Sequence, residues 1–246
     1  MHWYEDDDLW VGFADVMFPP SRAEEAERLM ATSPLLKVAD GARVLDLACG
    51  PATHVLPLAR KGAEVTGVDL SPAMLERARE VCEAAEVSVK LVQADMLEYV
   101  EPGAYDLIIN MYTSFGYFTE PGDNRTVLRN AFTSLAPGGS LLVDVLGKEV
   151  LAGWVGRPQA VDVDGGTVFM RDTILDDWTR LKTDWTLVRD GEVKQASILS
   201  FLYSAAELKA LFEAVGFTDV ECFGDFDGSP YDDSARRLIV RGVRAG

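Results

Sequence analysis

The sequence contains few histidines and cysteines, which excludes several kinds of catalytic site. Its 246 residues include two histidines, His2 and His54, and three cysteines, none of them in a Cys-x-x-Cys pair. This count excludes His-rich metal sites and most Ser-His-Asp arrangements. The widely spaced cysteines indicate neither a disulfide framework nor a zinc site. We therefore expect no metal, and any chemistry must rely on positioning or on Asp, Glu or Tyr.

Basic residues and long apolar runs are also scarce. Lys and Arg number 23 against 40 Asp and Glu, so the formal net charge is −17. This balance disfavours nucleic acid, whose binding depends on basic residues that release phosphate counterions. No uninterrupted apolar run reaches the roughly 20 residues that cross a bilayer, and no basic region precedes an apolar segment at the N-terminus. We expect a soluble, cytoplasmic protein without nucleic-acid or membrane partners.

The most informative stretch is residues 44–69, which read VLDLACGPATHVLPLARKGAEVTGVD. An apolar strand over 43–47 ends in a turn of small residues, and a helix follows over 53–61. A second buried strand over 65–68 then ends at Asp69. A carboxylate at the carboxyl end of the second strand of such a unit can accept two ribose hydroxyl protons. The unit therefore predicts a site for a nucleotide-like cofactor.

The turn favours a cationic cofactor over a dinucleotide. A dinucleotide fold carries Gly-x-Gly-x-x-Gly, which lets the pyrophosphate sit against bare backbone. Here Ala48, Gly50 and Ala52 occupy alternate positions, and Asp46 lies just upstream. A pyrophosphate would meet that acid with no Lys or Arg nearby before Arg60, whereas a cationic, zwitterionic ligand would suit the turn. A unit that binds nothing and a dinucleotide oxidoreductase remain alternatives at this point.

Strands and helices continue to alternate after Asp69. The pattern predicts strands over 87–92, 105–110 and 140–145, helices from Pro72 and over 124–135, and a turn at 137–139. Nearer the N-terminus, a helix over 21–32 is expected, with Ser21 as its N-cap and Glu24 as the capping-box partner. Such alternation is typical of a doubly wound, mostly parallel sheet.

Polar residues recur near the ends of the predicted strands. Asp46 lies near the end of the first strand, Asp69 ends the second, Asp95 follows the third, and Asn110 ends the fourth. Ligands of such sheets lie beyond the carboxyl ends of the strands, so these side chains are expected to converge. Three acids around an empty crevice would repel one another, and a positively charged ligand would relieve the repulsion. The alternative is that each acid only caps the helix that follows it.

These residues resemble motif I and the following strand ends of class I S-adenosylmethionine-dependent methyltransferases, over roughly residues 42–147. The resemblance implies that Asp46, Ala48 and Gly50 receive the methionyl tail and that Asp69 binds the ribose hydroxyls. The remaining implied cofactor-binding residues are Leu70 and Met74 beside the adenine, Asp95 and Met96 at its amine and ring, and Asn110 and Met111 between cofactor and substrate. The chain departs from the family pattern at Ala48 and Ala52, where many members have glycine.

The second half of the chain contains an insertion of alternating sequence. Segments 167–175, 181–189 and 193–203 are rich in Thr, Trp, Val and Ile and predict an antiparallel meander. No Pro-Pro-Tyr follows the fourth strand, so the chain resembles the small-molecule branch, especially natural-product and amino-sugar N-methyltransferases. In the amino-sugar enzymes a comparable sheet covers the substrate pocket or pairs subunits, which implies a possible homodimer here.

The expected fold class is α/β, a doubly wound, Rossmann-like and mostly parallel seven-stranded sheet with an inserted antiparallel sheet. The expected divisions are an N-terminal lid or helical segment at 1–35, a cofactor-binding core at 36–147 and 204–246, and the inserted sheet at 148–203, which covers substrate or mediates dimerisation.

The resemblance implies S-adenosylmethionine as the cofactor and N- or O-methylation of a small molecule, as in specialised metabolism. Displacement at a sulfonium methyl has a good leaving group, so positioning can supply most of the rate. An amine acceptor needs only its neutral form, whereas an alcohol needs a base, for which Tyr4, Tyr112 and His2 are the candidates. None of the three stands out. The alternative is a non-methylating protein, a pericyclase or a binding protein, that retains the cofactor structurally.

Overall fold

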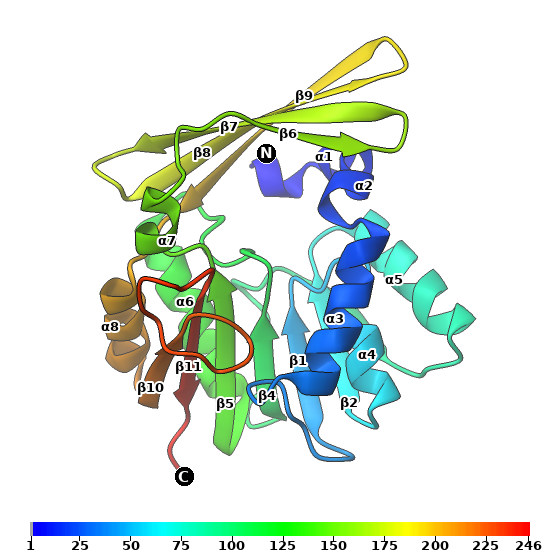
Figure 1. Ribbon diagram of the computed structural model, residues 1–246. Coiled ribbons are helices and arrows are strands. Elements are labelled where there is room, and N and C mark those ends of the chain that lie inside the picture. Colours follow the sequence, from blue (N-terminus) through cyan, green and yellow to red (C-terminus); the bar gives the residue numbers. More distant parts are fainter. Residues whose placement is uncertain (1) are drawn as a thin grey trace.

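The computed structural model describes residues 2–246, and its core is a seven-stranded sheet in the order β10-β11-β5-β4-β1-β2-β3 (Figure 1). The strands are β1 (Arg43–Leu47), β2 (Glu64–Asp69), β3 (Lys90–Gln93), β4 (Tyr105–Asn110), β5 (Leu135–Val145), β10 (Thr218–Phe223) and β11 (Leu238–Val243). Strands β1 to β5 pair in parallel, whereas β11 is antiparallel to both β5 and β10. The predicted doubly wound sheet is confirmed. Its strand order reverses between β1 and β4, which is where such sheets bind ligands.

Helices cover both faces of this sheet. One face carries α3 (Pro20–Thr32), α4 (Val55–Arg60) and α5 (Pro72–Ala84), and the other carries α6 (Pro121–Ser134) and α8 (Ala205–Val215). Val44 and Leu45 are consecutive in β1 but belong to the two different core clusters, because side chains alternate along a strand. Burial on both faces explains why the parallel strands read as nearly continuous apolar runs.

The predicted start of α3 is wrong. The helix begins at Pro20 and has Pro19 as its N-cap, with no side-chain capping hydrogen bond, so Ser21 and Glu24 form no capping box. Proline is favoured at the first helical position, because its φ is already helical and its missing N–H is not needed there. The geometry of Pro20 therefore decided the boundary, and Ser21 lies inside the first turn.

Three further boundaries differ from the predictions by three residues or more. Strand β3 begins at Lys90 and not at residue 87, because the amide of Val87 still donates to the carbonyl of Cys82 at the end of α5. Helix α6 begins at Pro121, three residues before its predicted start. The predicted turn at 137–139 lies inside β5, where the pairing with β4 shifts and leaves residues 136–139 as an irregularity.

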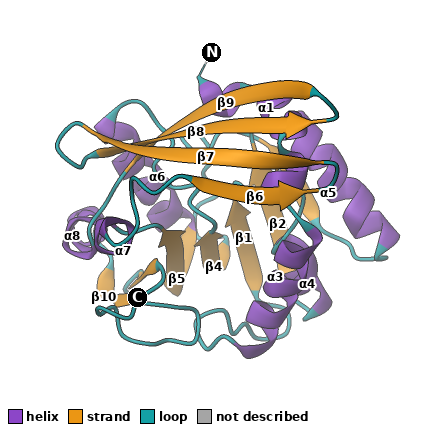
Figure 2. Cartoon of the chain, turned by 45° about the horizontal axis from the view of Figure 1, so that its top comes forward, coloured by secondary structure: helices purple, strands orange, loops and turns teal. Residues whose placement is uncertain are grey.

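The inserted sheet has four antiparallel strands in the order β6-β7-β8-β9 and lies over the carboxyl ends of the parallel strands (Figure 2). The strands are β6 (Gln159–Val163), β7 (Gly166–Leu175), β8 (Arg180–Arg189) and β9 (Glu192–Phe201), and α7 (Lys148–Ala152) precedes them. The predicted antiparallel sheet is confirmed, but the prediction did not include β6, a five-residue edge strand.

The N-terminal segment runs between the two sheets (Figure 1). It consists of the 3-10 turn η1 (Trp3–Glu5) and the short helices α1 (Asp7–Gly12) and α2 (Ala14–Met17). Its buried residues Leu9, Phe13 and Met17 form one cluster with Val168 and Leu187 of the inserted sheet. An ion pair of 2.7 Å between Asp15 and Arg189 joins the same two parts. Within residues 2–246, no helix has both the length and the apolar character that a membrane crossing requires.

We expect Leu187→Ala to destabilise the protein by about 2–5 kcal/mol, because it removes buried methyl groups and leaves a cavity between the sheet and the N-terminal segment. Leu187 is 2% exposed, whereas the next residue, Val188, points to the outer face and is 37% exposed. Val188→Ala is therefore the control and should change the free energy of unfolding much less. Urea unfolding measures both, and equal losses would contradict the packing described here.

Candidate functional site

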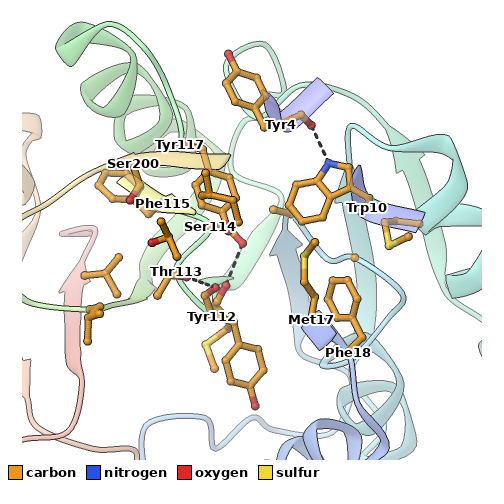
Figure 3. A pocket seen from close by; sticks show the side chains of 18 of the residues that line it. Tyr4, Trp10, Met17, Phe18, Tyr112, Thr113, Ser114, Phe115, Tyr117 and Ser200 are labelled. Atoms are coloured by element: carbon orange, nitrogen blue, oxygen red, sulfur yellow. Dashed lines mark hydrogen bonds between the residues drawn. The ribbon is translucent and has the colours of Figure 1, made fainter. Parts of the chain in front are cut away.

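A cavity of about 470 Å³ lies between the carboxyl ends of the parallel strands and the inner face of the inserted sheet. Its size is typical of a small-molecule or cofactor site. Figure 3 shows Trp10, Met17 and Phe18 of the N-terminal segment on one side of this space, and Phe115 and Ser200 on the other. The wall is mostly apolar and aromatic, so the few polar groups in it determine what can bind.

The turn after β1 brings backbone to the cavity wall. Ala48, Gly50 and Ala52 all have positive φ, at 59°, 53° and 67°. Glycine adopts this conformation easily, whereas alanine does so at a cost in strain, and strained residues cluster at ligand sites. A Cβ on Gly50 would lie 3.2 Å from the ring of Phe18. The two alanines that depart from the family pattern therefore adopt the backbone that glycine favours.

Asp69 ends β2 and is held by backbone amides. One carboxylate oxygen accepts from the amide of Gly50 at 2.8 Å and the other from the amide of Ser71 at 2.9 Å. Burial raises the pKa of Asp69, and these hydrogen bonds act in the opposite direction. Each oxygen keeps a further lone pair for a ligand hydroxyl, and the apolar Leu70 and Met74 line the cavity beside it.

Eight of the ten predicted cofactor-binding residues line the cavity: Ala48, Gly50, Asp69, Leu70, Met74, Asp95, Met96 and Met111. Asp95 also accepts from the amide of Leu97 at 2.8 Å, so it caps the turn that follows as well as facing the cavity. The structure therefore brings together the residues that follow β1, β2, β3 and β4, as the strand order requires.

Asp46 and Asn110 lie behind the wall and do not line the cavity. Asn110 is 1% exposed and donates to the carbonyl of Leu47 at 3.0 Å, so it links β4 to β1. Asp46 is also 1% exposed, and its Oδ2 lies 3.9 Å from Nδ1 of His54. Burial raises the pKa of Asp46 well above its usual range, and the nearby charge of Asp69 adds to the shift. Both residues support the turn, and their contact with a cofactor stays a prediction.

The three candidate bases have different surroundings. Tyr4 and Tyr112 line the cavity, whereas His2 is exposed, lies 3.2 Å from the hydroxyl of Thr119 and is not part of the wall. Burial raises the pKa of Tyr4, and burial with the charge of Glu25 raises that of Tyr112 to about 12. Neither phenol is ionised near neutral pH, so the cavity presents no ready tyrosinate base.

The cavity also contains two residues that the sequence did not single out. Arg22 of α3 is the only Lys or Arg among the described residues of the wall, and its guanidinium lies 4.4 Å from the centre of the Tyr112 ring. His54 is 4% exposed, its Nε2 has no hydrogen-bond partner, and burial lowers its pKa to about 3. His54 directly follows the turn, and this position could have marked it as a site residue. The sequence gives no such sign for Arg22, whose place in the wall depends on how α3 packs.

A buried ion pair supports the loop after β4. Arg237 of the C-terminal hairpin bonds to Asp144 of β5 at 2.7 Å, and the same carboxylate oxygen accepts from the amide of Tyr112 at 3.0 Å. Tyr112 and Thr113 both have positive φ, at 52° and 66°. The pair therefore helps to hold a strained segment at the cavity wall.

Part of the chain matches a known family. Residues 44–139 match the family described as methyltransferase domain. A curated relative, trans-aconitate 2-methyltransferase from Paracidovorax citrulli, is 35% identical over 131 residues, which are 52% of this chain and 46% of the relative. The chain thus spans about half the length of these curated relatives.

Solved structures resemble nearly the whole chain. An S-adenosylmethionine-dependent methyltransferase from Clostridium acetobutylicum has a TM-score of 0.79 at 17% identity and covers 97% of this chain and 100% of its own, which shows the shared fold. An S-adenosylmethionine-bound amino pentose methyltransferase from Micromonospora echinaspora, involved in calicheamicin biosynthesis, has a TM-score of 0.64 at 25% identity and covers 92% and 90%.

We expect His54 to make the protein less stable in mild acid. Its pKa is about 3 in the folded protein and near 6.5 when exposed, so below pH 6.5 only the unfolded chain takes up its proton. Stability is therefore lost as pH falls, by up to roughly 1.4 kcal/mol for each pH unit. Urea unfolding between pH 7.5 and 5 should show a shallower loss for His54→Gln than for the unchanged protein. Parallel pH profiles would contradict a neutral, buried His54.

Proposed function

We propose that this protein transfers a methyl group from S-adenosylmethionine to a small molecule in the cavity, since residues 44–139 match the methyltransferase-domain family. The observation that carries the proposal is the position of Asp69, whose two oxygens are oriented by the amides of Gly50 and Ser71 at the edge of the cavity. A ribose can bond there while its adenine lies against Leu70, Met74 and Met96.

The cofactor tail would then extend towards Arg22. The turn at Ala48 and Gly50 leads from Asp69 towards His54 and Arg22, and all of these residues line the same cavity. Burial lowers the pKa of Arg22, so an anion beside its guanidinium would compensate for lost solvation. We assign the methionyl carboxylate to Arg22, because the described wall offers no other Lys or Arg.

The acceptor would occupy the space under the inserted sheet. A lone pair on its nitrogen or oxygen attacks the methyl carbon, the carbon–sulfur bond breaks, and its electrons remain on the sulfur of S-adenosylhomocysteine. The acceptor then loses a proton to water. Since Tyr4 and Tyr112 are both neutral near pH 7, a neutral amine is the easier nucleophile, and a role in specialised metabolism agrees with the amino pentose methyltransferase named above.

Two further expectations are part of this proposal. A homodimer through the inserted sheet and a cytoplasmic location stay predictions. No observation in the cavity specifically favours the non-methylating alternative.

We expect Asp69→Asn to weaken S-adenosylhomocysteine binding by about 10-fold to 100-fold, because a charged acceptor of the ribose hydroxyls is lost. Isothermal titration measures the affinity, and release of S-adenosylhomocysteine from labelled cofactor with a panel of amines and alcohols measures turnover. Asp106→Asn is the matched control, because Asp106 pairs with Arg43 near the opposite end of the sheet. An unchanged affinity in Asp69→Asn would contradict the proposed site, and failure of every acceptor to yield product would favour the non-methylating alternative.

Arg22→Met tests the proposed orientation of the cofactor. We expect it to weaken S-adenosylhomocysteine binding by about tenfold, since a charge-assisted hydrogen bond to the carboxylate is lost. The affinity for 5′-methylthioadenosine, which lacks the amino acid tail, should not change, whereas Asp69→Asn should weaken both ligands. If Arg22→Met weakened both ligands equally, Arg22 would not hold the tail.

A further inference from the structure

The inner face of the inserted sheet packs against other parts of the protein at both ends, and its middle lines the cavity. At one end, Val168 and Leu187 pair across the strands and pack on the N-terminal segment. At the other end, Ile174 and Leu181 pair and pack on Leu151. Between or beside these pairs, the inward-facing side chains of β7, β8 and β9 that line the cavity are Met170, Asp172, Thr183, Trp185, Ile198 and Ser200, which we call the sheet window. Met170 and Trp185 also pack on the N-terminal cluster, and the whole window faces the acceptor space.

Asp172 is the only charged residue of the sheet window. Thr183 lies opposite it in the register, and the Thr183 hydroxyl donates to one of its carboxylate oxygens at 2.7 Å. In residues 2–246 no ion pair includes Asp172, and the nearby cation Lys182 pairs with Asp184 at 2.8 Å. Lys182 and Thr183 are consecutive in β8 and so point to opposite faces. The carboxylate is thus oriented by one hydroxyl and has no cation of its own.

Apolar side chains flank this carboxylate along the sheet. Met170 and Trp185 form the neighbouring cross-strand pair, and Tyr4 and Trp10 of the N-terminal segment line the same cavity. The indole Nε1 of Trp185 is buried without a hydrogen-bond partner. A half-buried acid in such surroundings is costly unless a ligand pairs with it, and aromatic faces add to the attraction for a cation.

The charges of the cavity select against an anionic acceptor. Asp69 and Asp95 are assigned to the cofactor, and Arg22 is assigned to the cofactor carboxylate. No Lys or Arg of the described wall then remains for the acceptor, whose compartment contains Asp172. A carboxylate or phosphate acceptor would meet this charge unpaired, whereas an ammonium or guanidinium group would neutralise it.

We propose that Asp172 is a specificity-determining residue that binds a cationic group of the methyl acceptor. This inference rests on the proposed function and deepens it. The bound cation is separate from the atom that receives the methyl group, because a protonated amine has no lone pair with which to attack the methyl carbon. The acceptor therefore carries two groups: a cationic anchor at Asp172 and a neutral nitrogen or oxygen nucleophile, with an apolar body between Trp185 and the N-terminal aromatics.

The test compares probes of one shape and different charge. The full chain, saturated with S-adenosylhomocysteine, is titrated by NMR with 2-phenylethylammonium, 2-phenylethanol and phenylacetate. We expect the ammonium to bind about tenfold more tightly than the alcohol, and phenylacetate to bind most weakly. Asp172→Asn and Asp172→Ser should both abolish the preference for the ammonium. Asp184→Asn, which removes the same charge from the outer face of the same sheet, should retain it.

Three results would overturn the proposal: equal binding of ammonium and alcohol, a preference that survives in both Asp172 variants, or a preference that Asp184→Asn removes equally. A merely structural role for Asp172 would lower the unfolding temperature of the variants without changing the ratio of probe affinities. The affinity for S-adenosylhomocysteine is measured in the same samples. If the unchanged protein did not bind S-adenosylhomocysteine, the proposed function would be contradicted. The charge preference, measured without cofactor, would still test Asp172.

Discussion

The site depends on one arrangement of hydrogen bonds, the carboxylate of Asp69 between the backbone amides of Gly50 and Ser71. It joins the turn after β1 to the end of β2 and to the start of α5. It also orients a half-buried acid and leaves lone pairs on its oxygens for a ligand in the cavity. The strained backbone of Ala48 and Ala52 persists because this arrangement and the packing around it stabilise the turn.

The second constraint is that the inserted sheet and the N-terminal segment cover the carboxyl ends of the parallel strands. The inserted sheet and the N-terminal segment share one apolar cluster and together close the crevice into a cavity. The core side of this cavity presents the groups assigned to the methyl donor, whereas the inserted sheet presents Asp172 among aromatic residues. In the proposed function, donor and acceptor recognition therefore belong to different parts of the chain, so that the acceptor could differ without a change in the cofactor half.

Local patterns predicted the parts of the fold that local forces decide. The alternation of apolar strands and helices indicated the sheet, and the strand-end positions predicted Asp69 and Asp95 correctly as cavity residues. Strand position did not reveal that Asp46 and Asn110 lie behind the cavity wall, because it does not say whether a side chain faces the cavity or supports it from behind. The sequence prediction also missed Arg22 and β6. The position of Arg22 depends on how α3 packs against the loop after β4, and β6 depends on its pairing with β7.

The central claim is that one cavity holds the methyl donor on Asp69 with room for an acceptor under the inserted sheet. A crystal structure of the chain with S-adenosylhomocysteine tests it most directly. The account predicts ribose hydroxyls at the carboxylate of Asp69, the tail carboxylate at Arg22, and the sulfur facing the space below the sheet window. Ligand bound with its ribose away from Asp69, or bound outside this cavity, would contradict the account.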